Sequence, residues 1–173
     1  TTTPIVFMGY MNPFEAMGAE NFCSRAYKSG LDGILLVDMP PEESRNFTRA
    51  ASANSLDLIR LIAPTTEEQR IKDICTDASG YIYYISVKGV TGANKFDPAE
   101  VKSKVDTIQS MTDLPVVVGF GIKDADSVTS VRDLSDGIVV GSALVSLIAE
   151  GKNQLADKIS NKIEELSSAL LRD

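Results

Sequence analysis

The sequence predicts an α/β protein with a parallel sheet, and three observations support this fold class. Short apolar runs alternate with amphipathic stretches from one end of the chain to the other. Most of these runs are continuously apolar rather than alternating, which is typical of parallel strands covered on both faces. The stretches between them show helical spacing and helix-start signals. We therefore expect one domain over residues 1–173, built from six strand–helix units.

The six expected strands are short, and each leaves room for a helix after it. They cover residues 5–8, 33–37, 58–62, 81–85, 116–120 and 138–140. Thr66 to Gln69 has the pattern of a capping box, and Asp97 before Pro98 has the pattern of an N-cap. Two apolar stripes at helical spacing predict core-facing helices, one with Val101, Val105 and Ile108, the other with Leu155, Ile159, Ile163, Leu166 and Leu170.

Composition limits the classes of function. The chain has 17 basic and 24 acidic residues and a net charge of −7, which disfavours general binding to nucleic acid or to an anionic membrane. Cys23 and Cys75 are isolated in the sequence and form no metal or redox motif, so we expect reduced thiols and a cytoplasmic protein. Histidine is absent, which removes Ser–His and Cys–His nucleophile pairs.

Six units leave two architectures open, because a closed barrel needs eight. An open doubly wound sheet of six strands would be complete at this length. Such a sheet should carry a Gly-x-Gly-x-x-Gly turn after its first strand, and the segment 8–13, Met-Gly-Tyr-Met-Asn-Pro, does not match it. The residues therefore slightly favour a (β/α)8 barrel that lacks two units.

Two of the expected strands end in glycine turns. Val116 to Gly121 closes with Gly-Phe-Gly, and Gly137 to Ser142 closes with Gly-Ser before an apolar stretch. Glycine lets the backbone approach an anion, and a helix that starts at Ser142 would point N–H groups at it. Barrel enzymes often bind phosphate at their last two strand ends, so the pair predicts a phosphate site.

Five blocks in order carry a resemblance to a known family: residues 4–13, 32–43, 89–93, 119–122 and 141–145. Together they closely resemble the tryptophan synthase α subunit. The resemblance implies a TIM barrel that cleaves indole-3-glycerol phosphate to indole and glyceraldehyde 3-phosphate. It also implies a β subunit as partner in an α2β2 heterotetramer, with pyridoxal phosphate bound only there and no cofactor in this chain.

By the same resemblance, the six units correspond to strands three to eight of the barrel. The family's first two strands would precede Thr1, together with its catalytic glutamate and aspartate. No equivalent carboxylates are found in this sequence. Because the cleavage needs acid and base groups, we expect this chain alone to be inactive.

The resemblance assigns the remaining site residues by position. The phosphate cradle would comprise Gly92, Gly119, Phe120, Gly121, Gly141 and Ser142. Tyr83 would point toward the glycerol part of the substrate, and Thr91 would belong to a lid over residues 89–94. Contact with the β subunit, or signalling to it, would involve Asn12, Phe14, Asp38 and Pro40.

An apolar slot for indole would be lined by Met8, Leu35, Ile62, Phe120 and Val139. A barrel core requires the same residue types, so this assignment has a purely structural alternative. Two other functions remain open: another phosphate-binding TIM-barrel enzyme, or a non-catalytic module that binds a phosphate ligand or activates a β subunit. The first of these would need its own acid and base groups, and Asp38 is the one candidate.

Overall fold

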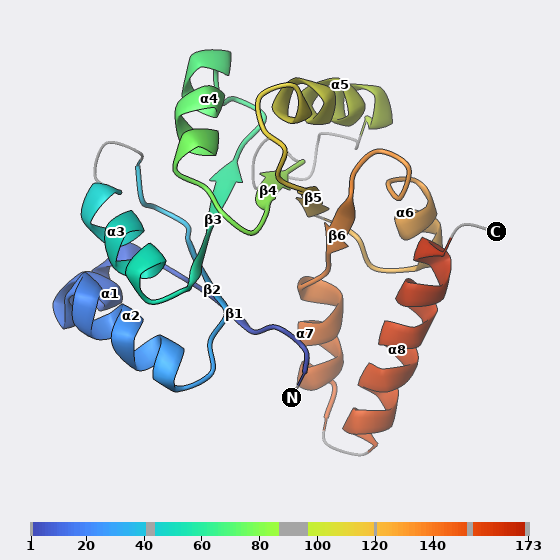
Figure 1. The fold of residues 1–173 in the computed structure, drawn as a ribbon. Coiled ribbons are helices and arrows are strands. Elements are labelled where there is room, and N and C mark those ends of the chain that lie inside the picture. Colours follow the sequence, from blue (N-terminus) through green and yellow to red (C-terminus); the bar gives the residue numbers. More distant parts are fainter. Residues whose placement is uncertain (1, 41–43, 87–96, 120, 152–153, 172–173) are drawn as a thin grey trace.

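A computed structural model describes residues 2–40, 44–86, 97–119, 121–151 and 154–171, in which strands and helices alternate (Figure 1). The strands are β1 (Val6–Gly9), β2 (Gly33–Leu36), β3 (Asp57–Ile62), β4 (Ile82–Ile85), β5 (Val116–Gly119) and β6 (Gly137–Val139). The helices are α1 (Met11–Met17), α2 (Ala19–Lys28), α3 (Arg45–Ala53), α4 (Glu68–Thr76), α5 (Pro98–Gln109), α6 (Ala125–Thr129), α7 (Ser142–Ala149) and α8 (Leu155–Leu170).

All six strands are parallel and are hydrogen-bonded in chain order, from β1 to β6. A doubly wound sheet reverses its strand order at a switch point, and no reversal occurs among the described strands. The sheet curls, and α3, α4, α5 and α6 follow one another around the outside of the arc (Figure 1). The chain therefore has the architecture of an incomplete (β/α)8 barrel, and the open doubly wound alternative is excluded.

The hydrophobic core lies between the sheet and these outer helices. One cluster joins β2 to α2 and α3 through residues such as Ile34, Cys23 and Phe47. A second joins β3, β4 and β5 to α4 and α5, and a third packs Leu166 of α8 against Ile122, Val128 and Val131. The side chains that alternate with these strand residues point to the opposite, concave face of the sheet.

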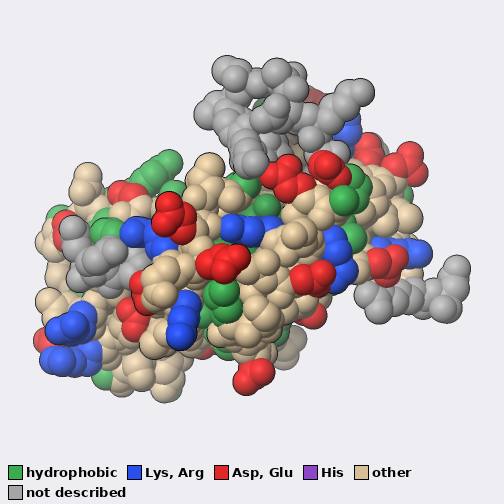
Figure 2. Space-filling view, turned by 90° about the horizontal axis from the view of Figure 1, so that it is seen from above, with side chains coloured by type: hydrophobic (Ala, Val, Ile, Leu, Met, Phe, Trp, Pro, Cys, Tyr) green, Lys and Arg blue, Asp and Glu red, His purple; other side chains and the backbone are tan. Residues whose placement is uncertain are grey.

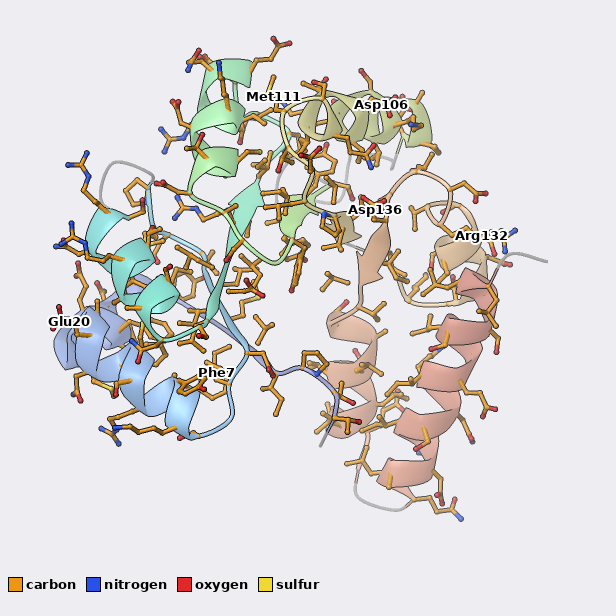
Figure 3. The ribbon with its side chains drawn as sticks, in the orientation of Figure 1. Phe7, Glu20, Asp106, Met111, Arg132 and Asp136 are labelled. Atoms are coloured by element: carbon orange, nitrogen blue, oxygen red, sulfur yellow. The ribbon has the colours of Figure 1, made fainter. Side chains whose placement is uncertain are left out.

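Polar side chains hold the starts of the strands in register. The Asp32 carboxylate accepts a hydrogen bond from the Ile5 N–H (2.7 Å), and the Ser79 hydroxyl accepts one from the Leu58 N–H (2.8 Å). Asp136, which Figure 3 labels before β6, accepts from the Val116 N–H (2.8 Å). Each residue precedes one strand and secures the backbone of its neighbour, so these bonds reinforce the N-terminal end of the sheet.

Helix starts were predicted with mixed success. Asp97 caps α5 by accepting from the Ala99 N–H, with Pro98 in the first turn, and α7 begins at Ser142 as expected. The capping box at Thr66 is wrong: α4 begins at Glu68, and its N-cap Glu67 makes no side-chain cap bond. The Thr66 hydroxyl accepts instead from the Ala63 N–H, 3.1 Å away, and closes the preceding turn.

The apolar stripe of α8 also departs from the prediction. Only Leu166 on this helix is buried, while Ile163 and Leu170 are exposed. The helix packs mainly on α6 and α7. Helical spacing shows which residues share a face, but it does not show how much of that face a neighbour covers.

Within the part of the chain that the structure describes, no helix is both long and apolar enough to cross a membrane.

Candidate phosphate site at the carboxyl ends of the strands

The two glycine turns lie next to each other because β5 and β6 are paired. Gly119 is in register with Val139 at the carboxyl ends of these strands. Gly121 has φ +69°, a conformation that favours glycine, and it turns the chain toward α6. Gly141 and Ser142 stand at the start of α7, and both are exposed. The structure thus brings together the described glycines of the predicted cradle.

The start of α7 is suited to an anion. No side chain caps this end of the helix. The Gly141 carbonyl accepts from the N–H groups of Leu144 and Val145, whereas the N–H groups of a first helical turn lack acceptors within the helix. Those N–H groups and the positive end of the helix dipole favour a negative ligand there.

Tyr83 lies directly over Gly119. A Cβ built at position 119 would overlap the hydroxyl group and ring of Tyr83. Burial raises the pKa of the Tyr83 hydroxyl, with a smaller contribution from Tyr81. The phenol is therefore neutral at pH 7 and can donate a hydrogen bond to a ligand. Glycine at 119 is required by this packing as well as by any approach of phosphate.

The strand register determines which predicted pocket residues share the concave face. Met8 pairs with Leu35, and both alternate with residues that face the helices. Tyr83 and Val139 are on the same concave face, since their neighbours Tyr84 and Ile138 pack on the outer side. Leu35 is buried, Val139 is half-buried and Met8 is exposed.

Ile62 does not belong to this set. Its side chain is fully buried in the cluster that includes Ile71, Ile74 and Val105 of the outer helices. Ile62 therefore faces the helix layer, and the sequence-based assignment of this residue to an indole slot is corrected. Its neighbour Leu61, which pairs with Tyr83, occupies the concave position instead.

A hydrogen bond to the Asp38 carboxylate connects the loop after β2 to the start of α1. The sequence analysis did not predict this bond. The Asp38 carboxylate, two residues beyond β2, accepts a hydrogen bond from the Met11 N–H at 2.6 Å. Met11 begins α1, whose N-cap Tyr10 makes no side-chain cap bond. Asp38 thus takes the part of an N-cap from a distant position in the sequence. Only the tertiary contact could reveal this pairing.

The four predicted rim residues differ in exposure. Asn12 and Asp38 are exposed and Pro40 is half-buried. Phe14 instead packs edge-on against Phe22, with ring centroids 4.5 Å apart, and lies against Gly9. The ring of Phe14 is partly buried against this core, and its contact with a partner stays a prediction.

Three predicted residues cannot be placed. Thr91 and Gly92, with the expected lid over 89–94, lie outside the described residues, and so does Phe120. Within the described residues, no group of three or more His, Cys, Asp or Glu side chains could hold a metal ion.

The chemistry available on the described concave face is therefore limited. From mid-strand to the carboxyl ends, Tyr83 is the one ionisable side chain on the described strands that points to this face. On the face shown in Figure 2, acidic and basic side chains are interspersed rather than gathered by sign. The described residues of this face offer backbone N–H groups, apolar side chains and the Tyr83 hydroxyl, and they include no pair of carboxylates for proton transfer.

The fold and its glycine-ended last strands define a protein of the (β/α)8-barrel class. The family model described as "Tryptophan synthase alpha chain" matches residues 1–171. The chain belongs to this family.

Curated relatives agree with the family match. The tryptophan synthase alpha chain of Paraburkholderia phymatum is 48% identical over 169 residues, which cover 97% of this chain and 62% of the relative. That of Acinetobacter baumannii is 46% identical, with 97% and 63% covered. The chain thus spans less than two thirds of the length of these relatives.

Solved structures share the fold. A chain from Aquifex aeolicus superimposes with a TM-score of 0.86 and 34% identity, covering 98% of this chain and 62% of that one. A chain from the tryptophan synthase α2β2 complex of Pyrococcus furiosus gives 0.85 and 36%, covering 97% and 68%. The curled arrangement of the six strands is therefore that of the family.

Proposed function

We propose that this chain forms the phosphate-binding part of a tryptophan synthase α subunit, a cytoplasmic lyase of tryptophan biosynthesis. Its substrate would be indole-3-glycerol phosphate, cleaved to indole and glyceraldehyde 3-phosphate. The observation that carries the proposal is the meeting of Gly119, Tyr83 and the uncapped start of α7 at one end of the sheet. The family match supports indole-3-glycerol phosphate as the ligand.

The proposed roles follow from where the side chains lie. The backbone at Gly119, Gly121, Gly141 and Ser142 would bind the phosphate, and the neutral Tyr83 hydroxyl would donate to the glycerol part. Leu35, Val139 and Met8 would form the apolar wall for indole. Phe120, Thr91 and Gly92 keep the roles that the family resemblance gives them.

The partner would be a β subunit that receives the indole. The relative from Pyrococcus furiosus is part of an α2β2 complex whose subunits activate each other. The exposed rim formed by Asn12 and Asp38, with Pro40 beside it, would face that partner. Free, buried Cys23 and Cys75 are compatible with a reducing compartment.

Ligand binding and turnover test the proposal separately. Calorimetric titration of the chain with indole-3-glycerol phosphate should show binding, and Tyr83→Phe should weaken it by about 0.5–1.5 kcal/mol, the net value of one hydrogen bond. Indole release should be undetectable, because the described concave face offers no acid–base carboxylates. Absence of binding by a folded sample would contradict the proposed ligand.

A second candidate function is favoured by that missing acid–base pair. The chain would then be a non-catalytic module that binds the phosphate ligand and activates a β subunit. Indole production after a βα segment bearing carboxylates is joined to the chain would support the lyase. Ligand binding that persists with no turnover in the joined protein would support the module.

A further inference from the structure

Helix α8 contacts both helices that follow the glycine turns. Helix α6 follows the turn at Gly121, and α7 begins directly after Gly141. In Figure 1, α8 runs beside α7 and reaches α6, and contacts between residues join it to both helices. The pairing of β5 with β6 ends at Gly119 and Val139, so the turns lie beyond it. Support for both turns must come from another element, and α8 is placed to give it.

The first contact of α8 is apolar and lies next to the Gly121 turn. Ile122, the residue after Gly121, is 4% exposed and shares a buried cluster with Leu166 of α8. Val128 of α6 and Val131 belong to the same cluster. Gly121 is exposed and has no side chain with which to fix its own position. The packing of Ile122 on Leu166 therefore holds the backbone of this turn.

The second contact is a hydrogen bond from the start of α6 to Glu165, the neighbour of Leu166 on α8. One carboxylate oxygen of Glu165 accepts from the Ala125 N–H at 3.2 Å, and the other accepts from the Lys162 ammonium at 2.8 Å. Ala125 is the first residue of α6, where N–H groups lack acceptors within the helix. The hydrogen bond from Lys162 lowers the pKa of the Glu165 carboxyl, so Glu165 is a charged acceptor at pH 7.

A short segment closed by its own hydrogen bonds joins Gly121 to α6. The Ser127 hydroxyl accepts from the N–H groups of Lys123 and Asp124, each at 3.0 Å, and donates to the Asp124 carbonyl. The Asp124 carboxylate accepts in turn from the Ser127 N–H at 2.9 Å. Because these bonds make the segment rigid, a displacement of Ala125 would move the Gly121 turn with it.

The third contact fixes the C-terminal end of α8. Arg132, in the segment between α6 and β6, is labelled in Figure 3 near this end of the helix. One nitrogen of its guanidinium donates to the Ala169 carbonyl at 3.2 Å and to the Leu171 carbonyl at 3.1 Å. The last carbonyls of a helix lack partners within it, and a cation is favourable there. The polypeptide around α6 is thus bonded to α8 both before and after that short helix.

We propose that α8 positions the phosphate cradle from behind, with Glu165 and Arg132 as its positioning residues. These two side chains keep the segment around α6 on α8, and α7 packs on the same helix. The two glycine turns are thereby held at a fixed separation. The inference rests on the proposed phosphate site at these turns. Neither Glu165 nor Arg132 touches the ligand, since both act through the backbone that binds it.

Nuclear magnetic resonance of the chain without ligand tests the positioning itself. Glu165→Ala should shift the amide resonance of Gly121 and speed hydrogen exchange at the Ala125 amide about fivefold to tenfold, as expected for one lost hydrogen bond. Glu165→Gln keeps an acceptor oxygen and should restore both readouts. Glu164→Ala removes an exposed carboxylate from the same turn of α8 and is the matched control. An unmoved Gly121 resonance in Glu165→Ala, or an equal shift in the control, would overturn the proposal.

Titration with inorganic phosphate, followed by the same resonances, tests the consequence for binding. Glu165→Ala and Arg132→Ala should each raise the dissociation constant about threefold to tenfold. Glu165→Gln and Arg132→Lys keep the acceptor or a donor and should recover most of the affinity, while thermal unfolding confirms that each variant is folded. Wild-type affinity in both alanine variants would overturn the positioning role. A wild-type chain that does not bind phosphate would instead contradict the proposed site, and the Gly121 resonance would still decide the positioning.

Discussion

Strands β1 and β2 are both apolar in sequence but differ in how far their residues are buried. Val-Phe-Met-Gly of β1 is half-buried or exposed throughout, whereas every residue of Gly-Ile-Leu-Leu in β2 is buried. The two strands are in register and both are apolar. The difference arises because β2 has a strand on each side and helices behind it, while β1 has one strand neighbour. Burial in this protein is therefore set by neighbours more than by residue type.

The largest expected effect comes from truncating one apolar residue on each of the two strands. Ile34→Ala in β2 removes a fully buried side chain and should lower the free energy of unfolding by about 2–5 kcal/mol. Met8→Ala in β1 should cost about 0.5 kcal/mol or less, because Met8 is mostly exposed. Urea unfolding followed by circular dichroism measures both. Similar losses would show that β1 is covered in solution.

A second test applies to the centre of the site. Gly119→Ala should destabilise the chain by about 1–3 kcal/mol, because the new methyl group overlaps Tyr83. In a Tyr83→Ala background the same change should cost much less, since the obstructing ring is gone. Thermal unfolding of the four variants in this cycle gives the coupling between the two positions. Additive effects would mean that Tyr83 does not lie over Gly119.

The loss of stability at alkaline pH tests the burial of Cys23 in the core next to β2. Burial raises the pKa of the Cys23 thiol from its usual value of 9.0 to about 11. As pH rises, the thiol of the unfolded state loses its proton first. The contribution of Cys23 to stability is therefore complete below about pH 9 and falls by about 2 kcal/mol as pH rises toward 11. Cys23→Ala should unfold with a shallower dependence on pH over this range, as urea titrations at several pH values would record. An unchanged slope would place the Cys23 thiol in contact with water.

The smallest expected effect concerns the hydrogen bond from the Met11 N–H, at the start of α1, to the carboxylate of Asp38, which follows β2. Asp38→Ala should cost about 1 kcal/mol or less, in the range of a lost helix cap, and should speed hydrogen exchange at the Met11 amide. Asp38→Asn keeps an acceptor oxygen and should retain most of the protection. Glu15→Ala, on the exposed side of α1, is the control and should leave this amide unchanged. Equal hydrogen exchange at the Met11 amide in all variants would show that the hydrogen bond to Asp38 does not protect it.

Several local features of the fold were predictable because their causes are local. Continuous apolar runs predicted the six strands to within one residue at each end, and the chemistry of Asp97 with Pro98 predicted the start of α5. The glycines at 119, 121 and 141 were predicted to lie together because strand ends in a parallel sheet share an edge. The prediction of a capping box at Thr66 was wrong because the Thr66 hydroxyl accepts a hydrogen bond from a backbone N–H of the preceding turn instead.

The sequence by itself determined the α/β class, the positions of the strands and the glycine turns, because these follow from apolar periodicity and from the backbone freedom of glycine. The order of the strands in the sheet was decided by the structure. Only the tertiary structure decided that Ile62 faces the helices, that Phe14 turns inward, that Asp38 secures Met11 and that Tyr83 covers Gly119. Each of these depends on register and on contacts between residues far apart in the chain. Such contacts are set by how the layers pack, and no local pattern records them.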